Sequence, residues 1–290
     1  MSDHTSDHTS ARTVDEERTV KELLETGCVV VPDVLTSNAV RRYREAIEKL
    51  HRTDPGVAAK RGSPGDLLHI ENLPGKGRLF EDYFLHPGVL GVVHRLIGDD
   101  CVLRDAWSLS LPPTDSVASR LKRVFGSLHC EDAVSVSEIV LSVTTTYPLV
   151  DFTVENGATL VVPGSHRRGR LPERDARDEA VPVEAPAGSC VMMLGALWHA
   201  AGENHSDQLR IAMGAYYARA WIRPFFDFTR ALPHEVLHRA TPAARRLYGL
   251  HVQPPYVERW MWDGVHGRPK PEFQEQLRAR GLGDCCLPDY

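Results

Sequence analysis

The chain is predicted to fold mainly as β-structure with flanking helices, arranged as a sandwich or barrel. Short strand-like runs, separated by glycine and proline turns, fill its middle from about residue 101 to 220. Amphipathic helical patterns precede and follow that region. The chain has 290 residues, 42% of them hydrophobic, which is enough to bury a globular core.

The N-terminal part predicts helix, strand and helix in succession. Apolar residues at helical spacing predict helices over 15–26, 36–51 and 80–97, the last interrupted at Pro87. The apolar run 28–31 predicts a buried strand. The segment 53–66, rich in glycine, proline and charge, is predicted to be a loop. Residues 1–14, which repeat Ser-Asp-His-Thr, are predicted to be a disordered tail.

The middle of the chain predicts a series of strands. We expect strands over 102–111, 139–147, 159–162, 181–183, 189–194 and 209–217, followed by a helix over 233–248. Residues 139–147 alternate, and their odd-numbered row, ending at Tyr147, is expected to face the interior of the β core. We therefore expect one domain over 15–290: a helical part (15–98), the β core (101–220) and an extension (221–290).

Charge and composition exclude several classes of protein. The net charge is −5 without a long basic block, which makes nucleic acid an unfavourable partner. No apolar run is long enough to span a bilayer, and the N-terminus is polar and unlike a signal peptide. The six cysteines lack disulfide-scaffold or zinc spacing, so we expect a cytoplasmic protein with reduced thiols. The sequence does not indicate an oligomeric state.

A candidate metal site begins at His129 and Glu131. On a strand these two side chains share a face, whereas Cys130 and Asp132 point the other way. Two histidines and one carboxylate hold Fe(II) on one side and leave positions open on the other. One strand cannot surround a metal, and His199, which follows an apolar run, is the best candidate for the second histidine.

The residues around these histidines resemble a known family. Glu-Asn-Gly at 155–157 and Pro-Gly-Ser-His at 163–166 lie between them, and Arg210 follows His199 by eleven residues. This order resembles the phytanoyl-CoA dioxygenase family of Fe(II)/2-oxoglutarate oxygenases, and looks closest to members that modify small natural products. The resemblance covers about residues 20–250. It departs from the family at Glu131, where the family has aspartate.

The resemblance implies a fold, cofactors and roles. It implies a double-stranded β-helix, which is the jelly-roll or cupin-like core, and an enzyme that uses Fe(II), 2-oxoglutarate and O₂ to oxidise a small organic substrate. The implied metal ligands are His129, Glu131 and His199. The implied 2-oxoglutarate contacts are Arg210, Thr159 and Tyr147. The alternative role for Arg210 is a surface ion pair with Asp207. The alternative for Tyr147 is that of an ordinary core tyrosine.

Some features stay open at this stage. His166 is interpreted as a loop histidine and not as a ligand. The basic residues of the 112–127 loop and the tryptophans at 260 and 262 fit substrate contact or ordinary surface and packing roles. Two other functions remain as alternatives: a non-catalytic cupin-like binding protein, and a metal-dependent isomerase or dioxygenase that does not use 2-oxoglutarate.

Overall fold

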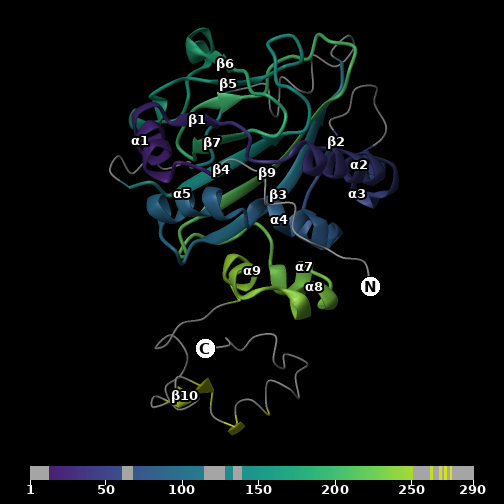
Figure 1. Ribbon diagram of the computed structural model, residues 1–290. Helices are drawn as coiled ribbons and strands as arrows, with labels where there is room; N and C mark the ends of the chain where they lie inside the picture. Colours follow the sequence, from purple (N-terminus) through teal and green to yellow (C-terminus); the bar gives the residue numbers. More distant parts are fainter. Residues whose placement is uncertain are drawn as a thin grey trace.

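Two antiparallel sheets form the core of the protein in the computed structural model, which describes residues 13–60, 68–113, 128–132, 139–250 and a few short pieces beyond (Figure 1). Within these residues the larger sheet has six strands in the order β1-β7-β4-β9-β3-β2, and the smaller has three in the order β6-β5-β8. The bounds are β1 Cys28–Val31, β2 Leu68–Ile70, β3 Val102–Leu111, β4 Ser142–Pro148, β5 Thr159–Val161, β6 Val181–Val183, β7 Cys190–Leu194, β8 His199–Ala200 and β9 Arg210–Ala218. Short strands β10 Trp262–Asp263 and β11 Arg268–Pro269 pair separately. The predicted mainly β fold is confirmed.

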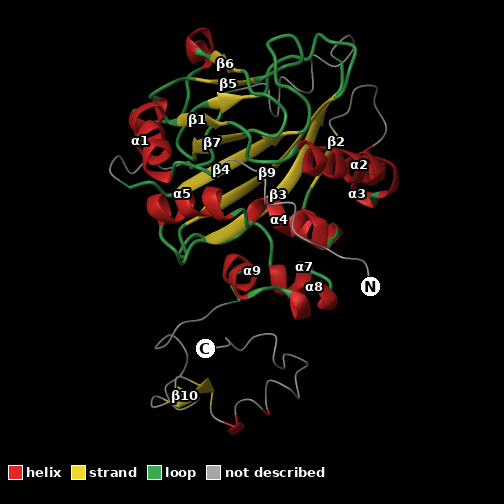
Figure 2. Cartoon of the chain, viewed as in Figure 1, coloured by secondary structure: helices red, strands yellow, loops and turns green. Residues whose placement is uncertain are grey.

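Helices cover the side of the larger sheet that faces away from β5 and β6 (Figure 2). The bounds are α1 Glu16–Thr26, α2 Ser37–Thr53, α3 Pro55–Lys60, α4 Glu81–Phe84, α5 Pro87–Ile97, α7 Phe228–Ala231, α8 His234–Arg239 and α9 Pro242–Leu247. Short 3-10 turns lie at Leu73–Lys76, Arg78–Phe80, Ser165–Arg167 and Arg174–Glu179. The ends of α1 follow from its sequence: Asp15 accepts from the Arg18 amide at 3.0 Å, and Gly27 ends the helix at φ 87°.

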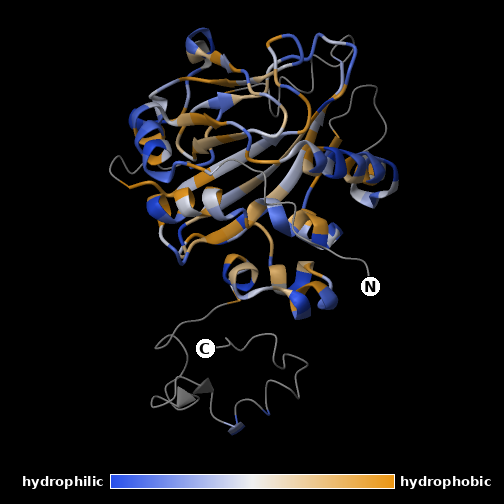
Figure 3. Cartoon of the chain, in the orientation of Figure 1, coloured by the Kyte–Doolittle hydropathy of each residue, from blue (hydrophilic) through white to orange (hydrophobic). Residues whose placement is uncertain are grey.

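The core has two layers of apolar side chains. One lies between the helices and the larger sheet and includes Leu23, Tyr83, Val92 and Tyr217. The other lies between the two sheets and includes Phe152, Val161, Val191, Met193 and Ala212. Apolar residues accordingly concentrate on the sheet strands and on the helix faces that meet them, while the outer helix faces are hydrophilic (Figure 3).

The two faces of β4 are assigned opposite to the prediction. Val143 and Tyr147 pack into the layer beneath the helices, and the Tyr147 hydroxyl donates to the Tyr83 carbonyl at 3.0 Å. Thr144 and Thr146 instead line the pocket between the sheets. The prediction that Tyr147 faces the site was therefore wrong. The physical reason is that the more apolar row buries itself against helices, and the hydroxyl row is left to face the pocket.

Other elements differ at their ends or in kind. Residues 55–60 of the predicted loop form α3, where the Asp54 carboxylate accepts from the amides of Gly56 and Val57. The predicted 233–248 helix is two helices, because Thr241 caps a new one that begins at Pro242. Strand β2 was not predicted. It pairs with β3, and β1 pairs with β7, so two strands of the N-terminal part belong to the larger sheet.

Several predicted features fall outside the described residues. These are residues 1–12 of the tail, 114–127 of the basic loop, and nearly all of the stretch after Leu250. Val14, placed in the tail by the prediction, is only 7% exposed and packs into the core. In the described part of the chain, no helix is both long and apolar enough to cross a membrane.

Candidate active site

A pocket of about 190 Å³ lies between the two sheets and collects the predicted site residues. His129, Glu131, His199, Thr159 and Arg210 all line it. The larger sheet forms its floor through residues of β3, β4, β7 and β9. Residues from distant parts of the chain therefore meet in one cavity, as the prediction requires, with Tyr147 as the exception.

Strand pairing brings the two histidines together. His199 begins β8 and pairs with Val161 of β5. On its other side it forms a bridge with His129, in which each amide donates to the other's carbonyl at 2.9 Å. The two imidazole centroids are 4.3 Å apart. The backbone thus holds both rings on one side of the pocket.

The three candidate ligands are spaced for one metal ion. Glu131 Oε1 lies 3.9 Å from His129 Nε2 and 3.8 Å from His199 Nε2, and the three ligand atoms lie within 4.8 Å of one another. These separations exceed a hydrogen bond. The three groups are therefore close enough together to hold one metal ion. Two imidazoles and one carboxylate are also the donor set that suits Fe(II).

His199 is prepared to be a neutral ligand. Its Nδ1 lies 3.0 Å from the Leu197 carbonyl oxygen, which can only accept, so Nδ1 carries the proton and Nε2 has its lone pair free. Burial, and secondarily the neighbouring His129, lowers the pKa of His199 to about 4. The ring is therefore neutral at physiological pH, which is the form that binds a metal.

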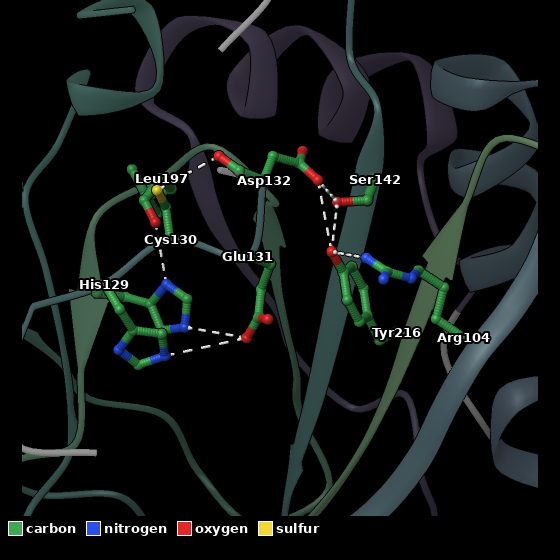
Figure 4. A network of polar contacts seen from close by, with 9 residues as sticks. Arg104, His129, Cys130, Glu131, Asp132, Ser142, Leu197 and Tyr216 are labelled. Carbon is green, nitrogen blue, oxygen red and sulfur yellow. Dashed lines mark hydrogen bonds and ion pairs between the residues drawn. The ribbon is translucent and has the colours of Figure 1, made fainter. Parts of the chain in front are cut away.

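Glu131 and Asp132 point in different directions, as predicted, although residues 128–132 form only a single β-bridge at His129 and not the expected strand. The amides of both residues donate to the Gly195 carbonyl, at 2.8 and 3.0 Å, so two residues oppose one as in a bulge. Glu131 turns toward the histidines, whereas Asp132 accepts from the Ser142 hydroxyl at 2.8 Å (Figure 4). The structure thus places Glu131 in the triad and Asp132 outside it.

A polar network behind Glu131 holds this backbone in place. Asp132 Oδ1 also lies 3.4 Å from the Tyr216 hydroxyl, which accepts from Arg104 at 3.0 Å (Figure 4). The Arg104 guanidinium stacks over the rings of Tyr216 and Phe225 at 4.9 and 3.9 Å. Because Asp132 follows Glu131 directly, these contacts orient the candidate ligand.

Gly195→Ala is expected to weaken metal binding about 10- to 100-fold, the range for loss of supporting contacts around a ligand. An added Cβ would overlap the Ser142 hydroxyl and lie 2.5 Å from Asp132 Oδ2, and Gly195 also carries the carbonyl that positions Glu131. Titration with Mn(II) measures the effect. The double variant Gly195→Ala/Ser142→Ala removes one clash and should recover part of the affinity. Parent-like binding by Gly195→Ala would contradict the positioning role.

Arg210 is a buried cation without a counter-charge. It is 3% exposed, which excludes the surface ion pair with Asp207. Within the described residues no carboxylate pairs with it: it donates to the Gly157 carbonyl, lies over the Phe152 ring at 4.5 Å, and its Nε has no acceptor. Burial alone lowers its pKa to about 9. An unpaired buried cation that lines a pocket predicts an anionic ligand.

The Glu-Asn-Gly segment provides the carbonyl that accepts a hydrogen bond from Arg210. Gly157 has φ 83° and lies against the backbone of 202–204, where a Cβ would be 2.9 Å from the Gly202 oxygen. Only glycine permits both the conformation and the close approach that bring its carbonyl to Arg210. Thr159, two residues on, is 9% exposed and lines the same pocket. His166 lies outside the triad, with its Nε2 3.3 Å from the Leu24 carbonyl, as interpreted.

The sequence reasoning missed several residues of the pocket. The hydroxyl row of β4 was recognised as a row but assigned to the wrong face. The pocket-facing residues of β3 and β9 and the rim residue Phe225 gave no signal, because they are mostly aromatic or apolar and look like core. The missed residues are His69, Asp105, Trp107, Leu109, Thr144, Thr146, Met193, Ala200, Ala201, Ala212, Tyr216 and Phe225.

Asp105 is an acidic residue of the pocket without a cationic partner. Burial raises the pKa of its carboxyl to about 7, with smaller raising effects of Glu71 and Glu131, while the Ala106 and Asn72 amides oppose the shift. Its Oδ1 is buried and has no hydrogen-bond partner. The folded protein therefore holds the Asp105 proton more tightly than the unfolded chain does.

Asp105→Asn is expected to remove a pH dependence of stability. In the parent, the contribution of Asp105 to the free energy of unfolding should be highest below pH 3.8, fall as the pH rises to about 7, and then level off, since the ionised carboxyl is disfavoured only in the folded state. The total is at most about 4 kcal/mol. Urea unfolding of both proteins at about pH 5 and about pH 8 measures it. An equal pH dependence in both would show that Asp105 is not the group responsible.

Comparisons with known proteins agree with this fold and with the predicted family. A family model described as phytanoyl-CoA dioxygenase (PhyH) matches residues 23–212. The dioxygenase trt7 of Aspergillus terreus is 25% identical over 261 residues, which cover 87% of this chain and 90% of that protein.

Two solved structures share the fold. The non-heme alpha-ketoglutarate-dependent epimerase SnoN from nogalamycin biosynthesis matches with a TM-score of 0.55 at 24% identity, over 76% of this chain and 90% of its own. HygX from Streptomyces hygroscopicus, solved with nickel and 2-oxoglutarate, matches with a TM-score of 0.58 at 19% identity, over 73% and 89%. The predicted jelly-roll core and the predicted enzyme class, an Fe(II)/2-oxoglutarate-dependent dioxygenase, are confirmed. With two thirds of its length matched, the chain belongs to the phytanoyl-CoA dioxygenase family.

Proposed function

We propose that this dioxygenase oxidises a C–H bond of a small organic substrate in the pocket between the sheets, with succinate and CO₂ as co-products. The roles proposed for the residues are Fe(II) binding by His129, Glu131 and His199, and 2-oxoglutarate binding by Arg210 and Thr159. The observation that carries the proposal is the buried, uncompensated Arg210 in the same pocket as the triad. A metal site alone would not need such a cation.

The pocket residues would have different roles in the reaction. His129, Glu131 and His199 would hold the ion with three donor atoms, a set that leaves room for 2-oxoglutarate and O₂ to bind it. Arg210 would hold the distal carboxylate of 2-oxoglutarate through its guanidinium, and the Thr159 hydroxyl would donate a hydrogen bond to it. Bound iron would supply the oxidation of the C–H bond by O₂, coupled to decarboxylation of 2-oxoglutarate. The apolar side chains of the pocket exclude water from the reacting carbon.

The test is made on the Fe(II) protein without oxygen. Adding 2-oxoglutarate should produce the charge-transfer absorption of a keto acid bound to Fe(II), and admitting air should release succinate. Binding of 2-oxoglutarate without succinate would favour a binding protein. Iron binding without any 2-oxoglutarate binding would favour a metal-dependent isomerase or dioxygenase that uses no keto acid, and would overturn the proposal.

A further inference from the structure

The pocket has two ends, and Arg210 marks only one of them. In the β3–β9 pairing Leu111 lies opposite Arg210, whereas Asp105 lies opposite Tyr216. Six residues of strand separate these two positions, which is about 20 Å. Asp105 and Arg210 nevertheless line the same pocket. A keto acid held at Arg210 and at the metal therefore leaves the Asp105 end free for the substrate.

Asp105 lines the pocket, and one of its two carboxyl oxygens lacks a hydrogen-bond partner among the described residues. The β3–β9 register shifts between Leu103 and Asp105, and such bulges re-aim a side chain. Its buried Oδ1 accepts no hydrogen bond, and in the described part of the chain no lysine or arginine pairs with it. The Ala106 and Asn72 amides donate to the carboxyl, but a buried carboxylate oxygen without a donor and without a cation is still costly. Such a group is a candidate to bind a ligand.

Aromatic rings surround this end of the pocket. Trp107 and Tyr216 line it from β3 and β9, and Phe225, 59% exposed, lies at its mouth. The Trp107 ring lies directly over Gly214, where any Cβ would overlap it. Aromatic faces next to a carboxylate are the environment in which proteins bind ammonium groups.

The charges of the proposed complex also leave Asp105 unbalanced. A divalent ion and Arg210 together offset Glu131 and the two carboxylates of 2-oxoglutarate. The charges of Arg104 and Asp132 offset each other, because both residues contact the Tyr216 hydroxyl and the guanidinium acts on the Asp132 carboxyl. The negative charge of Asp105 thus remains for a group that enters with the substrate.

We propose that Asp105 binds an ammonium group of the substrate, so that the C–H bond oxidised belongs to a small organic amine. This inference rests on the proposed function, and it assigns the far end of the same pocket. The ammonium nitrogen donates to the Asp105 carboxylate, and its carbon skeleton packs against Trp107, Tyr216 and Phe225. The target carbon then lies between Asp105 and the triad.

The experiment compares two probes of the same shape, cyclohexylamine and cyclohexanol. The full-length protein is loaded with Mn(II) and 2-oxoglutarate, and binding near the metal is followed by the paramagnetic broadening of the probe's proton signals. At about pH 8 Asp105 is ionised and the amine is protonated. We expect the parent to bind cyclohexylammonium on the order of tenfold more tightly than cyclohexanol. Asp105→Asn should lower the amine affinity to that of the alcohol.

Two controls separate this result from other causes. Glu71→Gln removes a neighbouring exposed carboxylate and should keep the preference for the amine. Asp105→Asn should bind Mn(II) and 2-oxoglutarate as the parent does, and Asp105→Ser serves as a second variant should the amide prevent folding. If the parent itself does not bind Mn(II) or 2-oxoglutarate, that result contradicts the proposed function and leaves the role of Asp105 to be judged separately.

Four results would overturn the inference. Three of them are equal affinity of the parent for the two probes, no binding of the amine, and a preference for the amine that persists in both Asp105 variants. A loss of both probes in Asp105→Asn would identify a neutral hydroxyl as the group recognised and would equally exclude the amine.

Discussion

Glu131→Ala is expected to bind Fe(II) at least about 100-fold more weakly than the parent, since the loss of contacts around a ligand alone costs 10- to 100-fold. The variant loses the only carboxylate that lies within 4.8 Å of both candidate histidine ligands in the described residues. The remaining imidazoles hold the ion without charge compensation. Iron content after desalting, and titration with Mn(II), measure the loss. Succinate formation in air should fall with it.

The matched control is the neighbouring carboxylate. Asp132→Asn keeps an acceptor oxygen for Ser142 and Tyr216, and it should bind metal within a few-fold of the parent. Glu131→Asp should retain partial activity, because it introduces the family's own ligand on a backbone placed for the longer side chain. Loss of metal in Asp132→Asn together with parent-like binding in Glu131→Ala would refute the assignment of the triad.

Arg210→Ala is expected to weaken 2-oxoglutarate binding far more than metal binding. Losing a charge-assisted bidentate pair costs on the order of 2–4 kcal/mol, roughly thirtyfold to a thousandfold in affinity. The loss should be near the upper end, because the guanidinium is buried and its Nε has no other acceptor in the described residues. Titration of the anaerobic Mn(II) protein with 2-oxoglutarate measures the change.

Arg210→Lys is the matched control for charge. It keeps a cation on the strand but cannot contact both carboxylate oxygens and the Gly157 carbonyl as arginine does. Its affinity for 2-oxoglutarate should lie between those of the parent and Arg210→Ala. Mn(II) titration without the keto acid should give similar affinities in all three. An Arg210→Ala protein that binds 2-oxoglutarate like the parent would remove this residue from the site.

Local patterns were enough for most elements and for the donor set. Gly27 and Thr36 mark helix ends through their own backbone and side-chain chemistry, so the ends of α1 and the start of α2 could be read from neighbouring residues. Strand parity placed His129 and Glu131 on one face and Asp132 on the other. The order of motifs around Gly157 and Arg210 identified the family. These inferences need only residues near each other in the chain, or the order of motifs along it.

The face of each strand could not be decided in that way. Parity shows that Thr145 and Tyr147 share a face, but which face is interior depends on what packs against it, and the helices over β4 come from residues far away in the chain. For the same reason the sequence did not predict that Asp105 lines the pocket. Its position opposite Tyr216 is set by the pairing of β3 with β9 and by a shift in their register. The sequence alone was enough to propose His129, Glu131 and His199 for iron and Arg210 and Thr159 for a keto acid, and it wrongly added Tyr147. Only the packing of the two sheets decided which other side chains share their pocket, because residues more than a hundred positions apart meet there.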